Sequence, residues 1–387
     1  HVTPAEILAL WPVTAIPNTR RWIAENVQGG ELSGVTAALR KDPGMPLRSS
    51  VRYDFSDGDV RFLPSFPPIT GGQGRAVFED SSYMMVLNKG VVTAPGGEMI
   101  DLADSVFTVV DVAQKPARAE IVLHTAGPLR AGLELLNNKP FEVLAKSGFD
   151  PGLVSADGHA TSLISFELLK DIPKEAVEFR TTGMLTDVRL QGLTGTLGDV
   201  VADRLDLALD PDLLAVSGEV RLGDVPVSGR WLQPLAPEES GQSRVEATVP
   251  LSRETLAGLG VRLDGVDLSG ASEAALTLEL PRDAPAAFTL TSDLVGLSLG
   301  LPGTGWGKAR GTAGALEIAG QVGPALSVDT LAIDAPGLAA DGRVTFGPDG
   351  AVTAVDFDRV RLGGWLDAPV TIRPATVGGA ADIAVLG

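Results

Sequence analysis

The sequence contains no cysteine and only three histidines, at positions 1, 124 and 159. It therefore has no disulfide framework, no thiol nucleophile and no cysteine-based zinc site, and it offers little imidazole for acid–base or metal chemistry. Aromatic residues make up 5% of the chain. No apolar run approaches the roughly 18 residues that span a bilayer as a helix, and no basic segment followed by an apolar one opens the chain, as a secretory signal would require.

Basic residues are in the minority. The chain has 31 Lys and Arg against 49 Asp and Glu, which gives a net charge of −18. Nucleic-acid binding needs a basic face that neutralises phosphates, so this composition argues against a nucleic-acid partner. It also argues against docking on anionic lipid headgroups by charge.

The residues that are abundant indicate a strand-rich, ordered chain. Hydrophobic residues are 44% of the sequence and the mean hydropathy is +0.18, which is typical of folded chains. The 46 glycines and 27 prolines are about a fifth of the residues, well above average usage. Many turn formers with many aliphatic and few aromatic residues favour many short strands around a loosely filled interior.

The helical signals concentrate at the start of the chain and at one later stretch. Thr3, Pro4 and Glu6 form an N-terminal capping pattern, and a second helix is expected from Asn18 to the glycines at 29–30. We expect four stretches in one elongated domain: a helical N-terminal segment at 1–45, a β-meander at 46–126, a helix-containing insert with strands at 127–183, and a continuing β-meander at 184–387. The chain starts at His1 and ends in a strand-like stretch at 381–387, so we expect a piece of a longer protein.

A helix is predicted between Gly127-Pro128 and the segment that ends at Pro140. Its leucines at 129, 133 and 136 form an apolar stripe. The polar side carries too few basic residues for a helix lying on a membrane surface. We therefore expect this helix to pack against the sheet and to cap part of its apolar face.

Elsewhere the chain alternates apolar and polar residues, which is typical of strands with one dry and one wet face. We count roughly 20–25 strands. Open sheets that large curl or split. We therefore expect a mostly β fold in which a long, twisted antiparallel sheet curls into an open apolar groove, with short capping helices. Between Val51 and Phe62 a strand–turn–strand unit is expected, with the turn at residues 56–58.

The apolar members of the alternating strands are the candidate groove-lining residues. They are Val51, Tyr53, Phe55, Val60, Phe62, Leu205, Leu207, Leu209, Leu276, Leu278, Leu280, Leu297, Leu299, Leu301, Val355 and Phe357. Exposed apolar surface is unfavourable in water, by roughly 25 cal/mol per Å², but hydrocarbon would remove that penalty. Each buried CH₂ contributes roughly 0.8 kcal/mol, so a 16-carbon tail gains about 10–13 kcal/mol before ordering costs.

The sequence contains a match to the Gly-x-Ser-x-Gly nucleophile elbow at residues 296–300. The serine lies inside an alternating strand, and no histidine follows position 159, so a strand is the better interpretation. No metal site, cofactor or catalytic residue is predicted, and an enzyme acting on lipid or polysaccharide ranks last.

Several ordered motifs resemble the central region of AsmA-like proteins of the YhdP branch. They are Leu8-Ala9-Leu10-Trp11-Pro12, Arg21-Trp22-Ile23, Gly29-Gly30, the stretch from Val51 to Phe62, Phe66-Pro67-Pro68-Ile69, the Gly127-Pro128 to Pro140 helix, Leu297 to Pro302, Trp306-Gly307-Lys308, and Gly337-Leu338 with Gly342 to Phe346. The series covers nearly the whole chain.

The resemblance implies an elongated β-groove, described as a taco, and a function. That function is the movement of glycerophospholipid across the periplasm of a Gram-negative bacterium, between the inner and outer membranes. It also implies an inner-membrane tether outside this chain and, as partners, phospholipid acyl chains and the two membranes; protein partners are not predicted. The alternative is a structural or assembly scaffold for outer-membrane biogenesis, similar to TamB.

Overall fold

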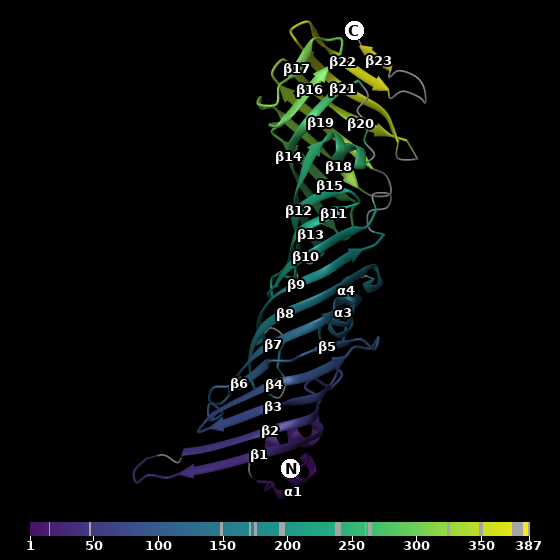
Figure 1. Ribbon diagram of the computed structural model, residues 1–387. Helices are drawn as coiled ribbons and strands as arrows, with labels where there is room; N and C mark the ends of the chain where they lie inside the picture. Colours follow the sequence, from purple (N-terminus) through teal and green to yellow (C-terminus); the bar gives the residue numbers. More distant parts are fainter. Residues whose placement is uncertain are drawn as a thin grey trace. The chain divides into compact units, whose positions relative to one another are not determined.

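The computed structural model describes residues 1–387 apart from 15, 46–47, 148–149, 170–171, 174–175, 193–197, 237–240, 260, 262–264, 323–325, 348–350, 374–381 and 386–387. The protein is mostly β, with 63% strand and 11% helix, and it has a long antiparallel sheet and few short helices. The expectation of a β-rich fold with roughly 20–25 strands is confirmed, since the described residues form strands β1 to β23 (Figure 1). None of the helices among these residues is long and apolar enough to cross a membrane.

The chain divides into two compact units. Unit 1 contains residues 1–190 and 204–212, and unit 2 contains residues 191–203 and 213–387.

Unit 1 is a meander in which strands from β1 to β9 follow one another nearly in chain order (Figure 1). Its elements are α1 (Pro4–Leu10), α2 (Pro17–Asn26), β1 (Val27–Arg40), β2 (Arg48–Val60), β3 (Ile69–Glu79), β4 (Ser82–Thr93), β5 (Met99–Asp101), β6 (Ser105–Val109), β7 (Arg118–Pro128), α3 (Leu129–Leu136), α4 (Val143–Ser147), η1 (Pro151–Leu153), β8 (Val154–Glu167), β9 (Glu178–Leu190) and most of β10 (Val200–Leu209). Strand β10 pairs with β9.

Unit 2 is a second meander, from which one hairpin branches. Its elements are β11 (Leu213–Leu222), β12 (Val225–Pro234), β13 (Gln242–Ser252), α5 (Arg253–Gly258), β14 (Asp267–Pro281), β15 (Ala286–Ser292), β16 (Leu297–Leu301), β17 (Trp306–Lys308), β18 (Ala315–Val322), β19 (Ser327–Ala335), β20 (Leu338–Phe346), β21 (Val352–Leu362), β22 (Leu366–Arg373) and β23 (Asp382–Val385). Strand β14 pairs with β15 over one part of its length and with β16 over another, while β15 continues the meander by pairing with β18. The hairpin β16–β17 therefore leaves the main sheet, and we call it the flap.

The first helix forms as its sequence pattern predicts. The Thr3 side chain accepts a hydrogen bond from the Glu6 N–H, and the Glu6 carboxylate accepts one from the Thr3 N–H, so the capping box is complete. The helical prediction for 1–45 is wrong beyond Asn26, because β1 begins at Val27. Gly29 and Gly30 lie inside that strand, where a Cβ on Gly30 would meet the backbone of β2. The two glycines therefore allow close strand pairing, whereas the prediction made them a helix stop.

The turn predicted at residues 56–58 is also wrong. Strand β2 runs through these residues to Val60, with irregular register against both β1 and β3. Asp57 has a positive φ of 51°, and Gly58 packs against the backbone of Gly72. A bulge absorbs a residue without reversing the chain, so the Ser-Asp-Gly signal produces a bulge here. The strand ends before Phe62.

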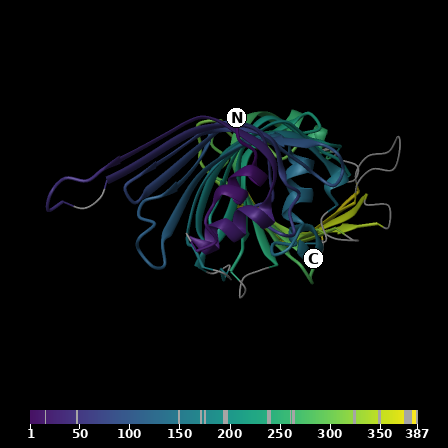
Figure 2. The same cartoon turned by 90° about the horizontal axis from the view of Figure 1, so that it is seen from below.

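Helix α3 forms over the predicted residues, but a different face is buried. Ala131 and Leu135 are buried, whereas Leu136, expected in the apolar stripe, is 39% exposed. The helix packs against the sheet, as expected, through a cluster with Leu87 and Ile100. Figure 2 shows the purple N-terminal helices and the blue helix α3 on one side of the strands of unit 1.

Candidate functional site

In unit 2 the pairing register aligns apolar residues from strand to strand. Directly paired residues of antiparallel strands share one face of the sheet, so a chain of such pairs defines a row across the sheet. The first row consists of Val216, Trp231, Val245, Leu278, Phe288, Gly320, Val328, Val344, Val355, Ile372 and Ile383. The second consists of Gly218, Gly229, Ala247, Leu276, Leu290, Ile318, Leu331, Gly342, Phe357, Val370 and Val385.

These two rows define the apolar face of unit 2. Every main-sheet strand from β11 to β23 contributes an apolar residue or a glycine to each row, and no charged residue interrupts either one. The face includes the predicted residues Leu276, Leu278, Val355 and Phe357. Leu280 has the same parity on β14 as Leu278 and pairs with Ser243. The other residues of the rows were not among the predicted ones, although most of them belong to alternating stretches.

The opposite face of unit 2 is polar. A row on that face runs through Ser217, Arg230, Glu246, Thr277 and Thr289. The Arg230 Nη2 and Glu246 Oε2 atoms are 2.7 Å apart. The hydrogen bond from Arg230 holds the pKa of the Glu246 carboxyl below its usual range. The alternation in the sequence therefore separates an apolar face from a charged one.

The apolar face is incompletely covered. Most of its large side chains, including Leu276, Leu278 and Phe288, are half-buried. In a sandwich with two interlocked layers, such residues would be sealed. Among the described residues, the largest side chains that are less than 2% exposed are Leu294 and Leu297.

Leu297 is the first residue of the flap and Leu294 lies just before it, and the two cover one margin of the face. Leu294, Leu297 and Leu268 form a core against which Leu316 and Ile333 of the main sheet pack. The predicted residues of β16 are all in this region: Leu297 is buried, Leu299 packs on the same core, and Leu301 packs on a neighbouring cluster with Leu338. These leucines lie in the cover over the sheet.

Unit 1 has a comparable apolar face. One row runs through Ala37, Val51, Phe78, Tyr83, Val109, Ala119 and Phe166. The next runs through Tyr53, Ala76, Met85, Phe107, Ile121, Ile164 and Phe179. The predicted residues Val51, Tyr53 and Phe55 lie on this face, which helix α3 covers in part: Phe55 packs against the α3 cluster. Val60 pairs with Ile69, which packs against the same cluster.

The other predicted residues of unit 1 have different placements. Leu205, Leu207 and Leu209 are half-buried on β10, and Asp206 and Ala208 between them are exposed. Phe62 lies outside the strands and is 41% exposed. Its ring contacts that of Phe66, with centroids 5.8 Å apart.

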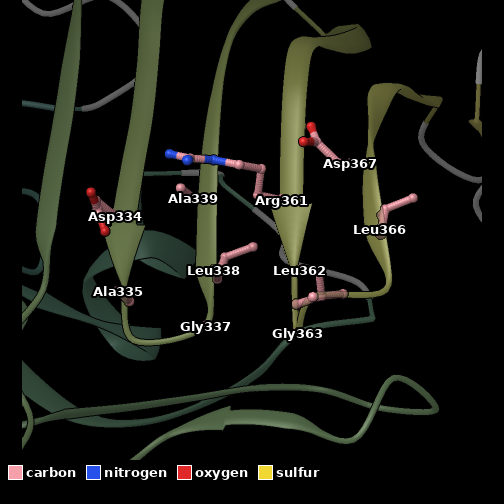
Figure 3. Close-up of a pocket in the computed structure, with 11 residues that line it drawn as sticks. Asp334, Ala335, Gly337, Leu338, Ala339, Arg361, Leu362, Gly363, Leu366 and Asp367 are labelled. Atoms are coloured by element: carbon pink, nitrogen blue, oxygen red, sulfur yellow. The ribbon is translucent and has the colours of Figure 1, made fainter.

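A hollow of about 360 Å³ lies in unit 2, where the β19–β20 and β21–β22 hairpins turn (Figure 3). Its described lining includes Asp334, Arg361 and Asp367 beside Leu338 and Leu366, with no histidine, serine or threonine among them. Asp367 is already engaged, since it accepts two hydrogen bonds of 2.7 Å from Arg359, which lower the pKa of its carboxyl. These groups do not form a nucleophile–base pair.

The described residues give no support to a serine hydrolase at residues 296–300. Ser298 lies within β16, opposite Ser269, and a nucleophile elbow needs a strand-to-helix turn. His124 contacts the hydroxyl of Thr161 at 3.0 Å. No group of three or more potential ligand side chains suited to a metal ion occurs in the described ranges.

No family model, curated protein or solved structure matches the chain. The apolar faces are therefore interpreted from their own geometry.

Proposed function

We propose that the protein is a non-enzymatic phospholipid conduit, which moves lipids between the inner and outer membranes by passing acyl chains along a hydrophobic groove. The proposal includes the groove shape and the periplasmic location, and it agrees with the AsmA-like motifs. The observation that carries it is the pair of uninterrupted apolar rows in unit 2, most of whose large side chains are only half-buried.

Physical chemistry links those rows to acyl chains. Half-buried aliphatic side chains leave apolar area in water. An acyl chain can displace that water, and each CH₂ group that it buries is stabilised by about 0.8 kcal/mol. Since every strand presents apolar residues and no charged group to this path, we expect no position to hold a chain by a specific polar contact. A headgroup that stays in water needs no specific site. These properties suit movement along a path better than storage at one point.

The proposal is tested by placing a charge on the apolar face. Leu278 lies between Val245 and Phe288 in the first row, so Leu278→Lys brings an ammonium group to the acyl path. Desolvating a charge is costly, and we expect co-purified phospholipid, measured by native mass spectrometry, to fall by about tenfold or more. Lipid transfer between vesicles should fall in parallel.

The matched control is Thr277→Lys, one residue along β14 on the polar face, opposite Glu246. This variant should retain lipid and transfer, and both variants should keep the circular dichroism of the wild type. Equal loss in both variants, or normal lipid binding in Leu278→Lys, contradicts the proposal. A wild-type protein that binds no lipid favours the assembly scaffold instead.

A further inference from the structure

The only two tyrosines of the chain meet on the apolar face of unit 1. Tyr53 is on β2 and Tyr83 on β4, with β3 between them. Their phenol oxygens are 2.9 Å apart, which is a hydrogen bond across the intervening strand. A polar pair thus lies in a region that is otherwise lined by apolar side chains.

The pair has hydrogen-bonding capacity left over. Each phenol has one O–H donor and can also accept, so a hydrogen bond between them uses only one of the two donors. Neither phenol has a further hydrogen-bond partner within the part of the chain that the structure describes. The pair is part-buried, and a donor that loses water on burial without gaining a partner is costly. The second O–H therefore favours an acceptor supplied by a ligand or by water.

The surroundings restrict which acceptor fits. Tyr83 packs against the buried cluster of Val109, Ala117 and Ala119, and its ring meets that of Phe107 with centroids 6.1 Å apart. Burial raises the pKa of both phenols, so they remain neutral donors. A phosphate calls for a guanidinium or ammonium partner, whereas a single neutral O–H suits a neutral carbonyl oxygen within an apolar molecule.

We propose that Tyr53 and Tyr83 form a hydrogen-bonding station for the ester carbonyl of an acyl chain that lies on the apolar face of unit 1. This inference rests on the proposed function and adds a specificity to it. The aliphatic rows accept any hydrocarbon chain, and the phenol pair distinguishes ester-linked from ether-linked chains. An ether lacks the carbonyl and is a weaker acceptor at the same position.

The experiment compares two lipids that differ only in this group. The full chain is incubated with an equimolar mixture of a diacyl phosphatidylcholine and its dialkyl ether analogue of equal chain length, and bound lipid is counted by native mass spectrometry. We expect wild-type protein to bind the ester form about fivefold in preference, the ratio that one neutral hydrogen bond supports. The double variant Tyr53→Phe/Tyr83→Phe keeps both rings, and its ratio should fall to about one.

Thr108→Val on β6 is the matched control. It removes a hydroxyl from the face of the same sheet opposite to the two tyrosines, and its ester preference should equal that of the wild type. Equal binding of the two lipids to the wild type, or an unchanged preference in the double variant, contradicts the proposed role of the tyrosine pair. Neither result contradicts the proposal of a lipid conduit. If the wild type binds neither lipid, the conduit fails and the station fails with it.

Discussion

At the residue scale, Lys308 shows how an apparent motif is used structurally. The stretch from Gly303 to Lys308 resembles a phosphate-binding loop, but the spacing is one residue short and Ala309 follows the lysine. The side chain is 3% exposed, and its ammonium donates to the carbonyl oxygens of Leu294 and Leu297 at 2.6 and 3.0 Å. Burial lowers its pKa. Lys308 therefore joins β17 to the first residue of β16 and to the segment just before it.

The tyrosine pair gives a prediction at the same scale. Since the chain has two tyrosines, tyrosinate absorbance in the near ultraviolet reports on Tyr53 and Tyr83 alone. Burial raises the pKa of both phenols, so near pH 10 the folded protein should be less ionised than an exposed tyrosine, which is about half ionised there.

The linked effect on stability has a definite sign. A phenol whose pKa is raised on folding stabilises the native state fully below the unfolded pKa of about 10, and that contribution is lost as the pH rises above it. The free energy of unfolding should therefore fall at alkaline pH, and ionisation should accompany unfolding. Normal titration near pH 10 in the folded protein would show that the pair is solvated.

At the element scale, local signals give an element's type more reliably than its buried face. Helix α3 forms between Gly127-Pro128 and Asn137 as predicted, because turn formers flank a short leucine-rich run. The predicted stripe at 129, 133 and 136 follows the leucines, whereas the sheet contacts the helix through Ala131 and Leu135. The position of the sheet relative to the helix decides this, and a single element does not encode it.

The orientation of α3 predicts different costs for two adjacent leucines. Leu135→Ala removes a side chain that is 8% exposed and packs with Leu87 and Ile100. It should lower the free energy of unfolding by about 2–4 kcal/mol, measured by urea denaturation. Leu136→Ala, at a position on the exposed side, should cost less than about 1 kcal/mol. Equal costs, or a larger cost at Leu136, would contradict the orientation of the helix.

Glycines within the apolar rows show that strand pairing decides the role of a residue in its element. Gly320 and Gly342 lie next to register shifts between neighbouring strands. A Cβ at either position would collide with a backbone carbonyl of the paired strand. Bulges of this kind keep the apolar residues on one face while the register changes. The sequence contains these glycines, but only the pairing shows which of the 46 have this purpose.

At the scale of the whole molecule, repulsion among acidic groups opposes the surface ion pairs. The net charge is −18, and pairs such as Arg230–Glu246 and Arg359–Asp367 have exposed side chains, so each contributes little. Salt screens both the repulsion among acidic groups and the attraction within the ion pairs. Because the net charge is large and each surface pair contributes little, we expect the repulsion to be the larger of the two. Raising the salt concentration from about 0.01 to 0.15 M should increase the unfolding temperature by about 1–3 °C. Calorimetry that shows a decrease would mean that ion pairs dominate.

Residue order alone was enough to predict that the protein is built mainly of strands with one apolar and one polar face. The period of two is a property of consecutive residues, so Leu276, Leu278 and Leu280 could be assigned to one face before any pairing was known. The same local signals located α1 and α3 and excluded a nucleophile elbow at Ser298.

The alignment of the strands and the segments that cover them become visible only in the folded chain. Leu278 lies between Val245 and Phe288 because of hydrogen bonds between distant segments, and Leu297 is buried because the flap leaves the sheet beside it. The tyrosine pair likewise exists only because β3 lies between β2 and β4. Alternation fixes the side on which a residue lies along its own strand. Register and branching depend on contacts between residues far apart in the chain, which no local pattern contains.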